Sequence, residues 1–151
     1  MSRSVQIETE HSPYAVRISV GAHTLHADEP NETGGADTGP DPYELLLAAL
    51  GSCTAITLWM YAERKRWPLQ SVEVVLRHSK TQAAGDSEVH SADQIERQIS
   101  FIGALSREQR QRLLQVAMNC PVHRTLTSQV RINTSAVEPT PASTGPSPAG
   151  N

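Results

Sequence analysis

The chain has 151 residues and a mass of 16.4 kDa, long enough to bury one hydrophobic core, so its two cysteines are not needed as a disulfide staple. Its formal net charge is −3 and its 13 Lys and Arg residues form no long basic run, which argues against nucleic acid as the main partner. The N-terminal segment is polar and lacks the apolar core of a secretory signal, so we expect a cytoplasmic, reducing environment.

Three short segments near the N-terminus alternate apolar and polar side chains, as half-buried strands do. They are residues 5–10, 14–20 and 23–27, separated by the run His11-Ser12-Pro13 and by Gly21. This pattern predicts an antiparallel meander. Residues 28–42 follow with three Gly and three Pro, and this composition predicts a long loop.

A long helix is predicted from residue 41 to about residue 66. Asp41 is a suitable N-cap, Pro42 suits the first turn, and Glu44 completes a capping-box pattern. The Trp-Pro pair at 67–68 ends the helix.

The middle of this helix, residues 45–62, contains no charge and reaches the lower limit for a membrane-spanning helix, roughly 18 residues. Small and polar residues interrupt it, and no second segment of this kind follows. We therefore expect no membrane insertion but a helix that is buried on all sides. One face would pack on the domain's own sheet and the other on a second copy of the chain, giving a homodimer.

The second half of the chain is predicted to contain strands around another helix. Residues 72–80 and 93–103 are predicted strands, joined by a turn at 83–88. Ser106 and Gln109 form a capping pattern for a second helix over residues 106–119, which Cys120-Pro121 ends. The predicted apolar side of that helix consists of Leu113, Leu114, Val116 and Ala117. A last strand is predicted at residues 128–134.

Together these elements predict a single α+β domain over residues 1–135. Residues 136–151 are rich in Pro, Ser and Gly, and we expect them to form a disordered tail. No internal repeat divides the domain further.

Three interpretations of Cys53 and Cys120 are open. Both could be inert, since free cysteine is often buried. A metal site is also conceivable, but only Cys120 and His123 have ligand spacing, so we expect no metal. The third interpretation is a redox pair. Burial in the helix disfavours a Cys53 thiolate, so this role needs a nearby cation, for which the candidates are Arg17, His123 and Arg124.

Two longer patterns carry a family resemblance. Residues 34–69, GGADTGPDPYELLLAALGSCTAITLWMYAERKRWPL, and residues 119–126, NCPVHRTL, resemble the OsmC/Ohr family of thiol-dependent peroxidases, and the similarity extends over nearly all of residues 5–134. Within that family the sequence is more similar to the OsmC-like branch that carries CPVH. The resemblance implies an intertwined homodimer with the two helices at its centre and the active sites at the subunit interface.

The resemblance also implies a reaction. Cys53 would attack an organic hydroperoxide and become a sulfenic acid, Cys120 would convert it to a disulfide, and a small or lipoyl-type dithiol would reduce that disulfide. No metal or bound cofactor would be needed. The implied function is a thiol-dependent peroxidase in oxidative or osmotic stress defence. The alternative is a small-molecule binding protein on the same dimer scaffold, with thiols that react slowly.

The sequence departs from the family near the start of the first helix. Ohr proteins carry an acidic residue directly after the helix-starting proline, where it pairs with an activating arginine. Here that position is Tyr43, and Glu44 comes one residue later. At about 3.6 residues per turn Glu44 lies roughly opposite Cys53, so we interpret Glu44 as a helix cap. The Gly-Gly-Arg context of the family's arginine is absent around Arg17, and Arg17, Tyr43, Glu44 and His123 are auxiliary candidates.

Overall fold

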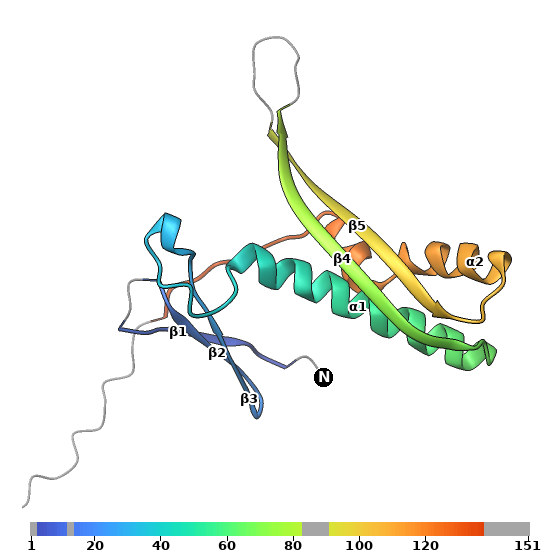
Figure 1. Cartoon of the computed structure of the whole chain (residues 1–151). Helices are drawn as coiled ribbons and strands as arrows, with labels where there is room; N and C mark the ends of the chain where they lie inside the picture. The colour runs from blue at the N-terminus through green and yellow to red at the C-terminus, as the bar shows by residue number, and fades with distance from the viewer. Residues whose placement is uncertain (1–2, 12–13, 83–90, 138–151) are drawn as a thin grey trace, which may run out of the picture.

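The computed structural model describes residues 3–11, 14–82 and 91–137 (Figure 1). It shows a mixed α+β fold with antiparallel strands, as predicted. In chain order the elements are β1 (Gln6–Thr9), β2 (Val16–Val20), β3 (His23–Ala27), the short 3-10 helix η1 (Asn31–Thr33), α1 (Pro42–Lys65), β4 (Leu69–Gln82), β5 (Ser91–Gly103), α2 (Arg107–Ala117) and α3 (Pro121–Leu126). The predicted turn at 83–88 and most of the predicted tail lie outside the described residues.

The N-terminal strands form the predicted antiparallel meander, in the order β1-β2-β3. Ile18 of β2 lies opposite Ile7 of β1 and Leu25 of β3, and Gly21, with a positive φ of 59°, provides the turn between β2 and β3. In Figure 1 this small sheet lies beyond the N-terminal end of α1, away from α2. The cores of the two halves of the chain are therefore largely separate.

The loop between β3 and α1 is organised by the buried carboxylate of Asp28. It accepts hydrogen bonds from the Thr38 hydroxyl at 2.8 Å and from the backbone N–H groups of Glu29, Ala36 and Thr38 at 2.8, 3.2 and 3.2 Å. The Thr38 hydroxyl and these N–H groups hold the pKa of Asp28 below its usual range, although burial opposes them. The loop is therefore a defined connection that fixes where α1 begins.

The start and end of α1 agree with the prediction. The Asp41 side chain accepts the Glu44 N–H at 2.8 Å, and the Glu44 carboxylate accepts the Asp41 N–H at 2.9 Å, which completes a capping box. The interpretation of Glu44 as a helix cap is thus confirmed. Arg66 ends the helix in a left-handed conformation, with φ 55°.

One stripe of α1 is buried in the core, at the four-residue spacing of Leu50, Thr54, Leu58 and Ala62. The core around the C-terminal half of this stripe is completed by residues from other elements, Leu69, Leu105, Leu113 and Ala117. By length and composition α1 is also long and apolar enough to cross a membrane, a property that it shares with the core helices of soluble proteins.

The ribbon formed by β4 and β5 crosses α1, and α2 lies beside the C-terminal half of α1 (Figure 1). Side chains on one face of the ribbon, Val72, Ile99 and Phe101, pack against the core. The ribbon ends at Gly103, where φ is 139° and an added Cβ would lie 2.2 Å from the Pro68 carbonyl oxygen. This close approach requires glycine and brings α2 back onto α1.

Three predictions for the C-terminal third are wrong in detail. The second helix ends at Ala117, and Cys120-Pro121 begins a third helix that was not predicted, because proline suits the first position of a helix as well as the end of one. Leu114, predicted on the apolar side of α2, is 47% exposed. Residues 128–134 form no strand, and Ile132 is 84% exposed, because no strand of the described chain lies beside them.

Candidate functional site

The two cysteines come together where α3 packs against the middle of α1. Cys53 is half-buried on α1, and Cys120 is 0% exposed at the start of α3. Both are free thiols. Thr54, the residue after Cys53 on α1, lies 3.6 Å from the Cys120 sulfur through its hydroxyl. The Cys53 thiol itself lowers the pKa of Cys120. The fold therefore juxtaposes two thiols that are far apart in the sequence.

Cys120 occupies the N-cap position of α3, with an extended backbone at φ −63° and ψ 145°. Its sulfur accepts the backbone N–H of His123 at 3.4 Å, as a serine or aspartate oxygen does at other helix starts. The hydroxyl of Thr54 lies 3.6 Å from the same sulfur, and either atom can be the donor. The sulfur thus has polar partners although it is shielded from solvent.

Thr54 connects this sulfur to an arginine on the ribbon. Its hydroxyl oxygen accepts a hydrogen bond from Arg97 Nη1 at 2.8 Å, and the hydroxyl donates to the Leu50 carbonyl oxygen at 2.7 Å. Thr54 is completely buried, and Arg97 is half-buried on β5. Among the described residues no carboxylate forms an ion pair with Arg97. Its positive charge therefore acts on the polar groups around Cys120.

These contacts shift the ionisation of Cys120. Burial raises the pKa of the thiol, but the His123 N–H, the Thr54 hydroxyl, the Cys53 thiol and the positive charge of Arg97 together lower it by more. The pKa of Cys120 is therefore below its ordinary value. A thiol with a lowered pKa is a better nucleophile at neutral pH, because the thiolate is the reactive form.

A cavity of about 250 Å³ lies beside this cluster, between β5 and α3. Its walls combine apolar and polar side chains, namely Leu50, Asp93, Ile95, Arg97, His123, Leu126 and Thr127. The Asp93 carboxylate accepts a hydrogen bond from His78 Nε2 at 2.9 Å. The His78 ring stacks on the Tyr43 ring, with 4.4 Å between the ring centroids. A small ligand with an apolar body and one polar group would match this lining.

Comparison with known proteins identifies the family. Residues 34–135 match the protein family described as "OsmC-like protein". The chain belongs to the OsmC-like family. No curated protein matches it.

Solved structures of OsmC-like proteins share the fold. An OsmC like protein from Mycoplasma pneumoniae is 16% identical, with a TM-score of 0.65 over 83% of this chain and 87% of that one. An organic hydroperoxide resistance protein OsmC from Legionella pneumophila is 16% identical, with a TM-score of 0.64 over 84% and 90%. The organic hydroperoxide resistance protein OhrB of Bacillus subtilis is 19% identical, with a TM-score of 0.59 over 84% and 91%.

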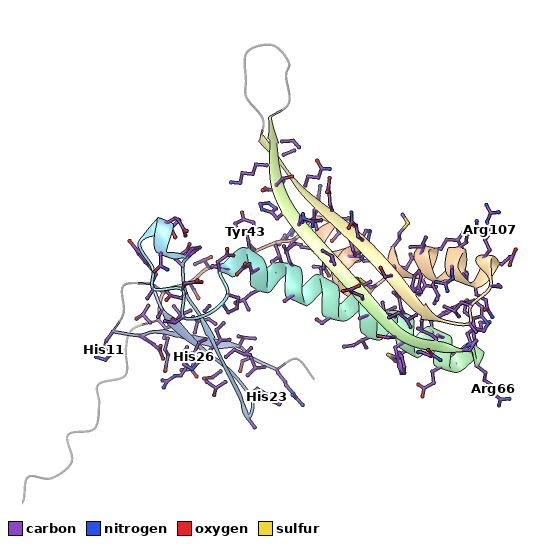
Figure 2. The ribbon with its side chains drawn as sticks, viewed as in Figure 1. His11, His23, His26, Tyr43, Arg66 and Arg107 are labelled. Atoms are coloured by element: carbon purple, nitrogen blue, oxygen red, sulfur yellow. The ribbon has the colours of Figure 1, made fainter. Side chains whose placement is uncertain are left out.

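The predicted auxiliary residues of this OsmC-like chain are distributed over three places. His123 lies at the thiol pair, because its backbone N–H contacts Cys120 and its side chain lines the cavity. Tyr43 lies at the start of α1, near the ribbon, where its ring stacks on His78 (Figure 2). Glu44 caps α1. Arg17 pairs with Glu8 within the N-terminal sheet and makes no described contact with either cysteine.

Two residues of the cluster, Thr54 and Arg97, were not predicted from the sequence. Arg97 had a detectable signal: it occupies an inward position of the β5 alternation, between Ile95 and Ile99, where an apolar side chain is expected. A charge at such a position is uncommon without a partner. Thr54 had no comparable signal, because a threonine inside a buried helix usually donates to the preceding turn, and Thr54 does so as well.

The structure also bears on metal binding. In residues 3–11, 14–82 and 91–137, no group of three or more His, Cys, Asp or Glu side chains is placed to hold a metal ion. His23 and His26 lie on β3 and His11 follows β1, so these three histidines belong to the N-terminal part of the molecule, beyond the start of α1 (Figure 2). The groups that the described residues bring together at the candidate site are two thiols, the Arg97 guanidinium and the Thr54 hydroxyl.

Proposed function

We propose that this protein is a thiol-dependent peroxidase that reduces organic hydroperoxides to alcohols in oxidative or osmotic stress defence. The observation that carries the proposal is the pair of free thiols, Cys53 and Cys120, placed together in an OsmC-like fold. Solved structures with this fold include proteins called organic hydroperoxide resistance proteins. We further assign the chain to the CPVH-containing branch of the family, on the sequence Cys120-Pro121-Val122-His123.

In the proposed reaction Cys53 is the peroxidatic thiol, because it is the more exposed of the two and a peroxide from solvent reaches it first. The Cys53 thiolate attacks the terminal peroxide oxygen, the S–O bond forms as the O–O bond breaks, and the alkoxide leaves as an alcohol after taking a proton. The Cys120 thiolate then attacks the Cys53 sulfenic sulfur. The S–S bond forms, and hydroxide leaves and takes a proton to become water.

A dithiol closes the proposed cycle by thiol–disulfide exchange, in which the dithiol is oxidised and both cysteines return to thiols. We propose a small or lipoyl-type dithiol as reductant and the cytoplasm as the location, because a reducing compartment maintains such dithiols. Substrate, reductant and the two cysteines complete this cycle without a metal or bound cofactor.

We propose that the active form is a homodimer in which α1 lies at the subunit interface. In the single chain, α1 leaves apolar side chains exposed next to β4, including Ile56 at 60% and Met60 at 58%. An open groove of about 550 Å³ also runs between α1 and β4, lined mainly by small and aliphatic side chains around Gly51. Burying these surfaces against a second copy would remove them from water, at roughly 25 cal/mol per Å² of apolar area.

One equivalent of an alkyl hydroperoxide should convert the reduced protein to the Cys53–Cys120 disulfide. Intact mass spectrometry should show a chain lighter by two hydrogens, and peptide mapping should link the two cysteine peptides. The rate distinguishes this proposal from the binding-protein alternative, because efficient enzymes commonly reach about 10⁴–10⁸ M⁻¹s⁻¹. A chain whose mass stays unchanged under peroxide, while a small molecule still binds, would support the alternative.

Sedimentation equilibrium at micromolar concentration should give twice the chain mass of 16.4 kDa. Replacing Ile56 by Glu should shift the protein toward monomer, because the introduced charge would be buried unpaired in the proposed interface. A wild-type protein that sediments as a monomer would contradict the proposed dimer.

A further inference from the structure

We infer that Arg97 is a positioning residue for Cys120, acting through the Thr54 hydroxyl to favour the Cys120 thiolate, the form that attacks the oxidised Cys53. The inference rests on the proposed peroxidase reaction and deepens it, because it assigns an activating cation to the resolving step. The cations expected from the sequence, Arg17, His123 and Arg124, were candidates for activating Cys53, and Arg97 was not among them.

The geometry forms a continuous chain of hydrogen bonds from the guanidinium to the sulfur. Arg97 Nη1 lies 2.8 Å from Thr54 Oγ1, and Thr54 Oγ1 lies 3.6 Å from Cys120 Sγ. Thr54 and Cys120 are both 0% exposed, so water does not screen the contact between them. A hydroxyl that accepts from a cation becomes a stronger donor, because hydrogen bonds in a chain polarise one another.

The Thr54 hydroxyl can change its acceptor without leaving a group unpaired. It now donates to the Leu50 carbonyl oxygen at 2.7 Å, and that oxygen is also the helical acceptor for the Thr54 N–H. When Cys120 loses its proton, the hydroxyl can rotate toward the sulfur, while Leu50 keeps its helical hydrogen bond. Arg97 still donates to the Thr54 oxygen in both states. The thiolate thus gains a second donor beside the His123 N–H.

The charged and titratable groups that act on this sulfur come from the elements packed around it: Cys53 on α1 and Arg97 on β5. Arg97 supplies the positive charge, and no described carboxylate pairs with it. The direction of the Cys120 pKa agrees with this arrangement, since the pKa is lowered despite burial. Arg97 therefore favours the thiolate by its charge, and Thr54 places a donor at the sulfur.

The Cys120 thiolate is the reactive form in the second half of the proposed reaction, the formation of the disulfide. It attacks the sulfur of the Cys53 sulfenic acid, forms the S–S bond and displaces hydroxide, and only the thiolate does so efficiently. A Cys120 with an ordinary thiol pKa would be mostly protonated at pH 7. The Cys53 sulfenic acid would then persist and be open to further oxidation.

The test measures the ionisation of Cys120 directly, in a Cys53→Ser background where Cys120 is the only thiol. Thiolate absorbance at 240 nm reports ionisation without a reagent having to reach the buried sulfur. Arg97→Gln keeps an N–H donor for Thr54 but removes the charge, and should raise the pKa of Cys120 measurably. Arg97→Lys keeps a charge and should restore most of the shift. Arg77→Gln removes an exposed charge from the paired strand β4 and should leave the titration unchanged.

The same variants with both cysteines present test the resolving step. After one equivalent of alkyl hydroperoxide, Arg97→Gln should convert the Cys53 sulfenic acid to the disulfide about tenfold more slowly than the wild type, at pH values below both Cys120 pKa values. Raising the pH should recover the rate of disulfide formation, which a purely structural defect would not do. Thr54→Val should act like Arg97→Gln, and Thr54→Ser, which keeps the hydroxyl, should act like the wild type.

An unchanged Cys120 titration in Arg97→Gln would overturn the inference, even if that variant is less stable. Should Arg97→Gln fail to fold, an unchanged titration in Thr54→Val would overturn it equally. A wild-type protein in which peroxide never oxidises Cys53 would overturn the proposed peroxidase reaction instead. In that case the absorbance titration of Cys120 in the Cys53→Ser background still decides whether Arg97 acts on Cys120.

Discussion

Replacing Cys53 by Ser is expected to abolish peroxide consumption. A serine hydroxyl is neither ionised nor nucleophilic enough to cleave an O–O bond at pH 7, so the first bond-forming step of the proposed reaction is lost. Consumption of an alkyl hydroperoxide under a dithiol reductant should fall to the rate of buffer with reductant alone. The loss should be complete, because Cys120 is fully buried and is not placed to receive a peroxide from solvent.

The fold should survive this substitution. Cys53 is half-buried beside the buried stripe of α1, and serine is smaller and adopts the same helical geometry. The unfolding midpoint and the sedimentation coefficient of Cys53→Ser should therefore match those of the wild type within the range of ordinary surface changes, about 0.5 kcal/mol. A folded Cys53→Ser protein that still consumes peroxide catalytically would contradict Cys53 as the peroxidatic thiol.

Cys120→Ser is expected to stop the reaction after one turnover instead of preventing it. Cys53 should still consume one peroxide per site, because its attack does not need Cys120. Without a resolving thiol the product remains a sulfenic acid, and further peroxide should convert it to a sulfinic acid. Intact mass spectrometry should show a chain that gains one oxygen atom and then a second, with no disulfide. Trapping with a dimedone-type reagent should label Cys53 only before the second oxygen is added.

Cys120→Ser is a conservative change, although Cys120 is buried and caps α3. Cys120 is the N-cap of α3, and serine is among the preferred N-cap residues, so its hydroxyl can accept the His123 N–H that the sulfur now accepts. The Thr54 hydroxyl remains close enough to pair with it.

If Cys120→Ser removes the first turnover and Cys53→Ser spares it, the two roles are reversed. If neither change matters and peroxide forms no disulfide, both cysteines are structural.

Much of the fold could be predicted because its signals are local. The capping box of α1, the Trp-Pro end of that helix and the alternation of β5 depend on neighbouring residues, and the structure places these elements where the sequence indicates. The failures occurred where tertiary structure decides. Residues 128–134 alternate as a strand does, but a strand also needs a partner, and the described chain offers none there. Pro121 is compatible with both the end and the start of a helix, so α3 could not be predicted from the sequence.

The candidate site could also be predicted from the sequence only in part. Both cysteines and His123 could be selected by residue type and by family resemblance, and the structure places them together. Arg97 could not be connected to Cys120, because the link passes through a threonine on a third element and depends on the packing of β5 over α1. Arg17 was selected because it is a cation on a strand, but in the single chain it pairs with Glu8. Spatial proximity across three elements leaves no pattern in a single sequence.

The two tryptophans of the chain give it separate optical reporters. Trp67 follows the end of α1, packs against the core and lies edge-on to Tyr61 at 5.5 Å between ring centroids, so its emission reports on folding. Trp59 is 46% exposed and lines the apolar surface beside β4, next to Ile56 and Met60. Its emission maximum would move to shorter wavelength when that surface leaves water. Dilution and unfolding can therefore be followed in one cuvette, with Trp59→Phe isolating the signal of the core.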